Sequence, residues 1–124
     1  MQPSTSSFLK PKTTVIVKNS LEGGPDLFLH CRSADNDLGM QHLHPNWSFT
    51  FRFRINFFGT TLFHCSFRWK HFLHKFVIYE ASRDVETCDL CSWEVKRDVP
   101  CMVFSHKRNS RAFQTLITIN NSDE

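Results

Sequence analysis

Apolar and polar residues alternate along two stretches in the middle of the chain. In residues 47–55 the odd-numbered positions are apolar and the even-numbered ones are serine, threonine or arginine, and residues 60–69 repeat the alternation from position 63 onward. Successive side chains of a β-strand point to opposite faces of the sheet, so each stretch is predicted to be an antiparallel strand with one buried and one solvated face. The predicted inward residues are Trp47, Phe49, Phe51, Phe53 and Ile55 in the first strand and Phe63, Cys65, Phe67 and Trp69 in the second. Gly59 lies between the strands and permits the backbone angles of a tight connection.

Shorter strands are predicted on both sides of this pair, separated by segments rich in Gly, Pro, Asn, Asp and Ser. They comprise Thr13–Lys18, Leu27–Arg32, Phe72–Tyr79, Leu90–Lys96 and Cys101–Phe104, with residues 112–120 as a possible eighth strand. No long stretch carries the helical repeat of apolar residues, so no substantial helix is expected. Together these features predict an all-β fold, an antiparallel immunoglobulin-like β-sandwich of seven to eight strands.

The length of 124 residues is sufficient for one domain with a buried core. We expect a flexible N-terminal lead over residues 1–12, the sandwich domain over 13–104, and a C-terminal extension over 105–124 that begins with a basic run. No apolar run is long enough to span a membrane, so no membrane span is expected. The net charge of +3 is mild and does not by itself indicate nucleic acid binding.

Several segments occur in an order that is typical of one plant family. They are VIVKN, LHCRSADNDLGMQHL, FTFRFRINFFGTTLFHCSFRW, KFVIYEASRD and CDLCSW, followed by Cys101. Over residues 13–101 the chain resembles the plant self-incompatibility proteins, also called S-protein homologues. The resemblance implies a small secreted antiparallel β-sandwich that acts as a recognition ligand in the rejection of self pollen.

The resemblance also sets the functional expectations. It implies an extracellular, non-enzymatic signalling ligand without a cofactor, which binds a cell-surface receptor protein. We expect a monomer that binds no nucleic acid. The first fifteen residues contain no apolar run typical of a secretory signal, so the extracellular location is expected from the resemblance alone. No serine or cysteine lies in a recognisable nucleophile motif, in agreement with a protein that is not an enzyme.

Five cysteines are many for a protein of a reducing compartment, and disulfides are therefore expected. Cys31, Cys65 and Cys91 fall on the apolar faces of their predicted strands. Guided by the family resemblance, we expect Cys65–Cys91 and Cys31–Cys101 disulfides, with Cys88 unpaired. Five reduced thiols are the alternative.

The loop around Asp35, Asn36 and Asp37 resembles a calcium-binding loop at first sight. However, an EF-hand loop that started at Asp35 would place Asn46 at its twelfth position, where a bidentate glutamate is needed. Asp and Asn before a glycine are typical of a turn, because their side chains bond to their own backbone. We therefore predict a turn, which as an exposed loop would also contribute to a partner surface.

The polar faces of the two central strands carry basic side chains. Arg52, Arg54, Arg68 and Lys70 would form a basic stripe if these two strands were neighbours. Alternation sends the interleaved aromatic residues inward, which argues against the exposed stacking platform of a nucleic acid binder. The stripe is predicted to bind an acidic surface of the receptor.

Two other functions remain open at this level. Cys88 and Cys91 could bind zinc together with His64, His71 or His74, although the spacing fits no standard zinc motif. A positive surface could instead bind acidic cell-wall polysaccharide, as in a defence protein. Asn46 and Asn120 begin tripeptides that fit the N-glycosylation pattern, so an exported chain is expected to be a glycoprotein.

Overall fold

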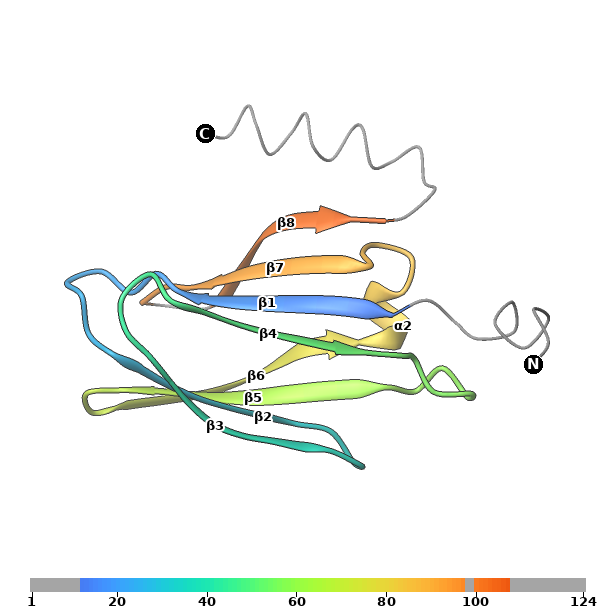
Figure 1. Ribbon diagram of the computed structural model, residues 1–124, viewed down its shortest axis with the longest axis horizontal. Coiled ribbons are helices and arrows are strands. Elements are labelled where there is room, and N and C mark those ends of the chain that lie inside the picture. The colour runs from blue at the N-terminus through green and yellow to red at the C-terminus, as the bar shows by residue number, and fades with distance from the viewer. Residues whose placement is uncertain (1–11, 98–99, 108–124) are drawn as a thin grey trace, which may run out of the picture.

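The computed structural model describes residues 12–97 and 100–107, which form two layers of β-sheet (Figure 1). One sheet has the strand order β4-β1-β7-β8 and the other has the order β3-β2-β5-β6. The elements are β1 (Thr13–Asn19), β2 (Leu27–Arg32), β3 (Asp37–Leu43), β4 (Ser48–Phe53), β5 (Leu62–Trp69), β6 (Phe72–Glu80), the short helix α2 (Ala81–Asp84), β7 (Leu90–Val95) and β8 (Pro100–His106). The prediction of an all-β sandwich without a substantial helix is confirmed.

Neighbouring strands are antiparallel except for β1 and β7, which run parallel. β1 therefore lies in the middle of its sheet, between an antiparallel and a parallel partner. Its residues alternate between buried and half-buried positions along the whole strand. The sequence alternation is preserved here because only one side of this sheet faces the core.

Strand β3 was not predicted. Its apolar residues Leu38, Met40 and Leu43 do not alternate regularly with polar ones, and only Leu43 is buried. β3 lies at the edge of its sheet and pairs with β2 alone, so it needs little apolar surface on its inner face. The eighth strand predicted for residues 112–120 lies outside the described residues.

The core lies between the two sheets and is built from the predicted inward positions. Phe63, Cys65, Phe67 and Trp69 of β5 are all buried. Aromatic pairs join the sheets, with ring centroids 5.0 Å apart for Phe51 and Phe63, 4.8 Å for Phe53 and Tyr79, and 5.3 Å for Phe76 and Trp93. Edge-to-face and tilted contacts of this kind add to the free energy gained from burying the rings.

The inward prediction was wrong for Trp47, which is 55% exposed. Strand β4 starts only at Ser48, and Trp47 belongs to the turn before it. The alternation rule applies to a side chain only where its backbone is extended in the sheet, so the pattern was continued one residue too far.

The predicted disulfide pairing was also wrong. Cys31 is bonded to Cys65 and Cys88 is bonded to Cys91. Cys31 and Cys65 lie directly opposite each other on the adjacent strands β2 and β5, with Cα atoms 4.0 Å apart. Cys101 is exposed and lies outside both disulfides, because it pairs with Glu94 at an outward position of its sheet. The burial predicted for Cys31, Cys65 and Cys91 is confirmed.

Candidate functional site

Two connections at one end of the sandwich line a cleft. They are the turn between β2 and β3 and the loop between β4 and β5, both at the right-hand end in Figure 1. The cleft has a volume of about 490 Å³. Connecting loops that a rigid sheet holds in place are a common location for binding sites.

The first wall is the β2–β3 turn, which the sequence predicted to be a turn. The Ser33 amide donates a hydrogen bond to the Asn36 carbonyl (2.8 Å), and the Asn36 amide donates to Ser33 Oγ (3.2 Å). Asp37 Oδ1 accepts hydrogen bonds from the Gly39 amide (2.9 Å) and from His30 Nε2 (2.6 Å). The Gly39 amide and then the His30 imidazole lower the pKa of the Asp37 carboxyl. These local bonds account for the Asp and Asn residues, and the prediction of a turn is confirmed.

The second wall is the β4–β5 loop, which is closed by a small network of side chains. The Asn56 amide donates to Thr61 Oγ1 (2.7 Å), and the Thr60 amide donates to Asn56 Oδ1 (2.9 Å). Gly59 has a φ of +69° and donates its amide to the Asn56 carbonyl (3.1 Å). The loop therefore has a defined conformation, in which a left-handed glycine reverses the chain.

This loop presents two aromatic side chains to solvent. Phe57 and Phe58 are 88% and 81% exposed, and their rings meet edge to face with centroids 5.3 Å apart. Solvent exposure of two adjacent large apolar residues is unfavourable, because each could bury well over a hundred Å² of surface in a contact. We call Phe57 and Phe58 the aromatic tip. Paired exposed aromatic residues beside a cleft are typical of a binding surface.

The cleft itself combines an apolar floor with charged walls. Phe53 and Phe63 line it from the two sheets, and Arg32 and Arg54 reach it from opposite walls, together with Asp35. Two guanidinium groups against one carboxylate favour an anionic or carbonyl-rich ligand. Of the predicted partner surface, the structure thus brings Arg54, Asp35 and Asn36 together.

The predicted basic stripe does not form. Arg52 belongs to β4, Arg54 directly follows the end of β4, and Arg68 belongs to β5, and β4 and β5 lie in different sheets. The Arg68 guanidinium lies 4.8 Å from the ring centroid of Phe28 on the outer side of its own sheet. Lys70 is in the β5–β6 turn, at the end of the sandwich opposite the cleft (Figure 1). The prediction assumed that strands consecutive along the chain are neighbours in a sheet, which does not hold for β4 and β5.

The zinc alternative based on Cys88 and Cys91 is contradicted by the structure. These cysteines are buried and bonded to each other, so they offer no thiolate to a metal ion. Among the predicted histidine ligands, His74 is stacked on Trp69, with ring centroids 5.2 Å apart.

Of the two glycosylation candidates, Asn46 is exposed in the turn before β4 and has a left-handed φ of +70°. Its accessibility agrees with the expectation, and the modification itself stays a prediction. Asn120 lies outside the described residues. Among the residues that the structure does describe, no helix has the length and apolarity needed to cross a membrane.

Sequence reasoning missed the aromatic tip and the contribution of Arg32. The segment NFFGT was interpreted only as a tight connection. A usable signal was present: two successive phenylalanines cannot both face the core in a strand, and here they directly precede the turn glycine. That Arg32 and Arg54 line the same cleft had no local signal, because it depends on how the two sheets pack.

Comparison with known proteins agrees with the resemblance in the sequence. The model of the plant self-incompatibility protein S1 family matches residues 14–115. The chain is 42% identical over 90 residues to S-protein homolog 5 of Arabidopsis thaliana, covering 73% of this chain and 70% of the relative. It is 44% identical over 92 residues to S-protein homolog 3 of that plant, with 71% and 61% covered, and 41% identical over 106 residues to S-protein homolog 2, with 80% and 66% covered.

The matched segment therefore spans less than two thirds of the length of S-protein homologs 3 and 2. No solved structure matched the chain. These matches show that the chain belongs to the plant self-incompatibility protein S1 family.

Proposed function

We propose that this chain is a secreted, non-catalytic recognition ligand that binds a receptor protein on the surface of plant cells. The observation that carries the proposal is the aromatic tip, which is held by an ordered loop directly beside the cleft. Aromatic anchors near the centre of an interface contribute most of its binding free energy. The tip would insert into an apolar pocket of the receptor.

The charged walls of the cleft would supply specificity. Arg32 and Arg54 can pair with carboxylates or backbone carbonyls of a receptor segment that enters the cleft. Such pairs speed association and select among partners more than they add affinity. The net charge of +3 also favours association with an acidic receptor surface.

Two further features support an extracellular role. The structure contains two disulfides, and disulfides form and persist in oxidising compartments. Membership in a family named for self-incompatibility supports recognition between cells as the process. The sandwich would then serve as a rigid scaffold, and the loops at the cleft end would determine which receptor is bound.

The test is binding of the labelled full-length protein to plant protoplasts, with and without mild protease treatment of the cell surface. Saturable binding that is lost after protease treatment is expected. In Phe57→Ala/Phe58→Ala, the apparent Kd should rise at least about tenfold, because both anchors are removed. Arg54→Glu should also weaken binding and reduce its dependence on salt.

Matched controls separate the cleft end from the rest of the surface. Phe72→Ala/Leu73→Ala removes two apolar residues that are 50% and 58% exposed at the opposite end of the sandwich. Arg52→Glu reverses an exposed charge two positions before Arg54. Both control variants should bind as the unmodified protein does. Equal binding by all four variants would contradict the proposal, and salt-sensitive retention on pectin instead of on cells would indicate polysaccharide binding.

A further inference from the structure

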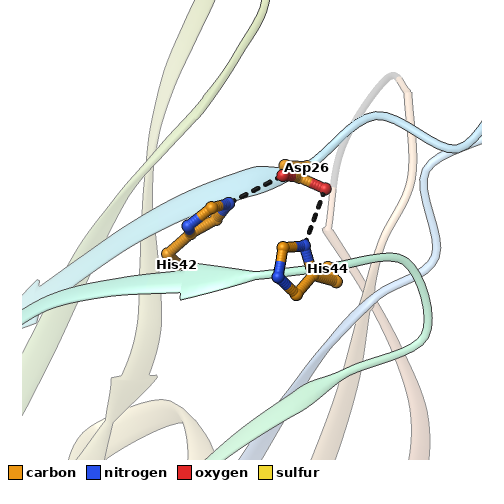
Figure 2. Close-up of side chains that lie close together, drawn as sticks. All are labelled: Asp26, His42 and His44. Atoms are coloured by element: carbon orange, nitrogen blue, oxygen red, sulfur yellow. Dashed lines mark hydrogen bonds and ion pairs between the residues drawn. The ribbon is translucent and has the colours of Figure 1, made fainter.

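A second cluster of functional side chains lies at the end of the sandwich opposite the cleft. Asp26, His42 and His44 point toward one another there (Figure 2). We propose that these three residues form a binding site for a divalent transition-metal ion, with Zn²⁺ as the ion that fits best. The site is separate from the cleft and does not depend on the function proposed above.

Strand register brings the three residues together. Asp26 directly precedes β2, His42 lies in β3, and His44 is the first residue after β3. Leu27 pairs with Leu43, so the positions before β2 and after β3 are neighbours across the hairpin. His42 and His44 are two residues apart, which places both imidazoles on the same face.

The distances suit a zinc ion. Asp26 Oδ2 lies 2.7 Å from His42 Nε2, and Asp26 Oδ1 lies 3.2 Å from His44 Nδ1. All three ligand atoms lie within 4.8 Å of one another. Ligand atoms around a tetrahedral zinc ion with bonds near 2.0–2.1 Å are about 3.3 Å apart, so small side-chain rotations would complete the geometry.

Neighbouring rings hold both imidazoles in place. The His42 ring stacks on Phe28 with a centroid distance of 4.5 Å, and the His44 ring meets Trp47 edge to face at 4.5 Å. The two imidazole centroids are themselves 4.7 Å apart. Since these ligands are ordered before an ion arrives, less conformational entropy is lost when it binds.

The backbone below the cluster is also fixed by a buried side chain. Asn19 Nδ2 donates hydrogen bonds to the Pro25 carbonyl (2.9 Å) and to the Leu43 carbonyl (3.0 Å). These are the residues immediately before Asp26 and His44. One buried asparagine therefore holds the two backbone segments that carry the ligands at a fixed separation.

The donor set and its exposure favour zinc over harder ions. Two imidazole nitrogens and one carboxylate suit Zn²⁺ or Cu²⁺, whereas Ca²⁺ and Mg²⁺ prefer oxygen ligands throughout. The side chains of His42, His44 and Asp26 are 46%, 47% and 38% exposed, so an ion can enter from solvent and bind a water molecule as its fourth ligand.

A bound ion would tie the start of β2 to the turn that leads from one sheet to the other. In that turn the Trp47 amide donates to the His44 carbonyl (2.9 Å). An ion that binds only the folded chain raises the free energy of unfolding in proportion to the logarithm of its concentration. Zinc would therefore stabilise this end of the sandwich.

Isothermal titration of the oxidised full-length protein with ZnCl₂ tests the proposal. A Cys101→Ser background excludes binding of zinc to that thiol. We expect one ion per chain, and a rise in Tm of about 5 °C or more when zinc is in hundredfold excess over its Kd. His42→Gln, His44→Gln and Asp26→Asn should each raise the Kd at least about tenfold, while circular dichroism shows an unchanged fold.

His71→Gln is the matched control, because it removes an exposed histidine from a different turn. It should bind zinc as the parent does. Trp47 provides a second readout: CuCl₂ should quench its fluorescence at one equivalent, and Trp47→Phe should abolish that response but retain zinc binding. No binding below millimolar zinc, or equal binding by the cluster variants and the control, would show a hydrogen-bonded cluster only and overturn the proposal.

Discussion

At the scale of single residues, Asp84 shows how a buried carboxylate is accommodated at the end of α2. Its side chain is 4% exposed. Its two oxygens accept hydrogen bonds from the Glu80 amide (2.9 Å) and from Arg83 Nε (2.8 Å) and Nη2 (2.6 Å). The Arg83 guanidinium in turn lies 5.8 Å from the ring centroid of Trp93. Asp84 thus connects the end of β6, the helical turn and the core.

We predict that Asp84→Ala lowers the free energy of unfolding by about 2–3 kcal/mol. This loss of stability is smaller than for breaking a fully buried ion pair, because the Arg83 side chain is 39% exposed and water can solvate it after the substitution. Urea unfolding followed by tryptophan fluorescence would measure it. In Asp35→Ala, which removes an exposed carboxylate, the free energy of unfolding should stay within about 0.5 kcal/mol of the parent value. An equal loss in both variants would contradict the stabilising role of the Asp84 carboxylate.

At the scale of elements, the two disulfides constrain very different lengths of chain. Cys31–Cys65 joins β2 to β5 across 34 positions, and Cys88–Cys91 joins residues only three positions apart. The entropy that a disulfide removes from the unfolded chain grows with the length of the closed loop. The bridge between β2 and β5 should therefore contribute more to stability, although both bridges are buried.

We predict a loss of about 4 kcal/mol for Cys31→Ala/Cys65→Ala and about 2 kcal/mol for Cys88→Ala/Cys91→Ala. Alanine is the replacement because serine would bury an additional hydroxyl group. Urea unfolding of both variants under non-reducing conditions checks which disulfide contributes more to stability. Mass spectrometry of unreduced peptides should detect a species joining Cys31 to Cys65, and a peptide joining Cys65 to Cys91 would contradict the structure.

At the scale of the whole molecule, the residues that stabilise the fold and those proposed to bind a partner occupy separate places. Phe67 is fully buried between the sheets, whereas the aromatic tip projects from the end of the sandwich. Burial contributes to stability only where surface is removed from water on folding. The thirteen phenylalanines of the chain thus fall into groups with different roles.

We predict that Phe67→Ala lowers the free energy of unfolding by about 3–5 kcal/mol, through lost burial and the cavity that remains. The double variant Phe57→Ala/Phe58→Ala should change it by less than about 0.5 kcal/mol. Thermal and urea unfolding of both proteins, compared with the parent, provide the test. Marked destabilisation of the double variant would show that the tip is part of the fold and weaken its assignment as a binding surface.

Much of the architecture could be predicted because alternation is a local property. In β5 from Phe63 to Trp69, the position of a residue along the strand decides which face its side chain is on. All the residues predicted to face inward are buried. The same rule predicted that Cys31, Cys65 and Cys91 face the core. β3 could not be predicted in this way, because its apolar residues Leu38, Met40 and Leu43 do not keep a regular alternation. An edge strand with one partner needs little buried apolar surface.

The sequence by itself determined which side of each major strand faces the core, where the chain turns at Asp35 and Asn36, and which family it belongs to. Only the tertiary structure decided which strands are neighbours. That choice placed Arg54 and Arg32, but not Arg68, along one cleft, bonded Cys31 to Cys65, and brought Asp26 to His42 and His44. The physical reason is that side-chain direction depends on the local backbone, whereas pairing and register depend on contacts between residues far apart in the chain.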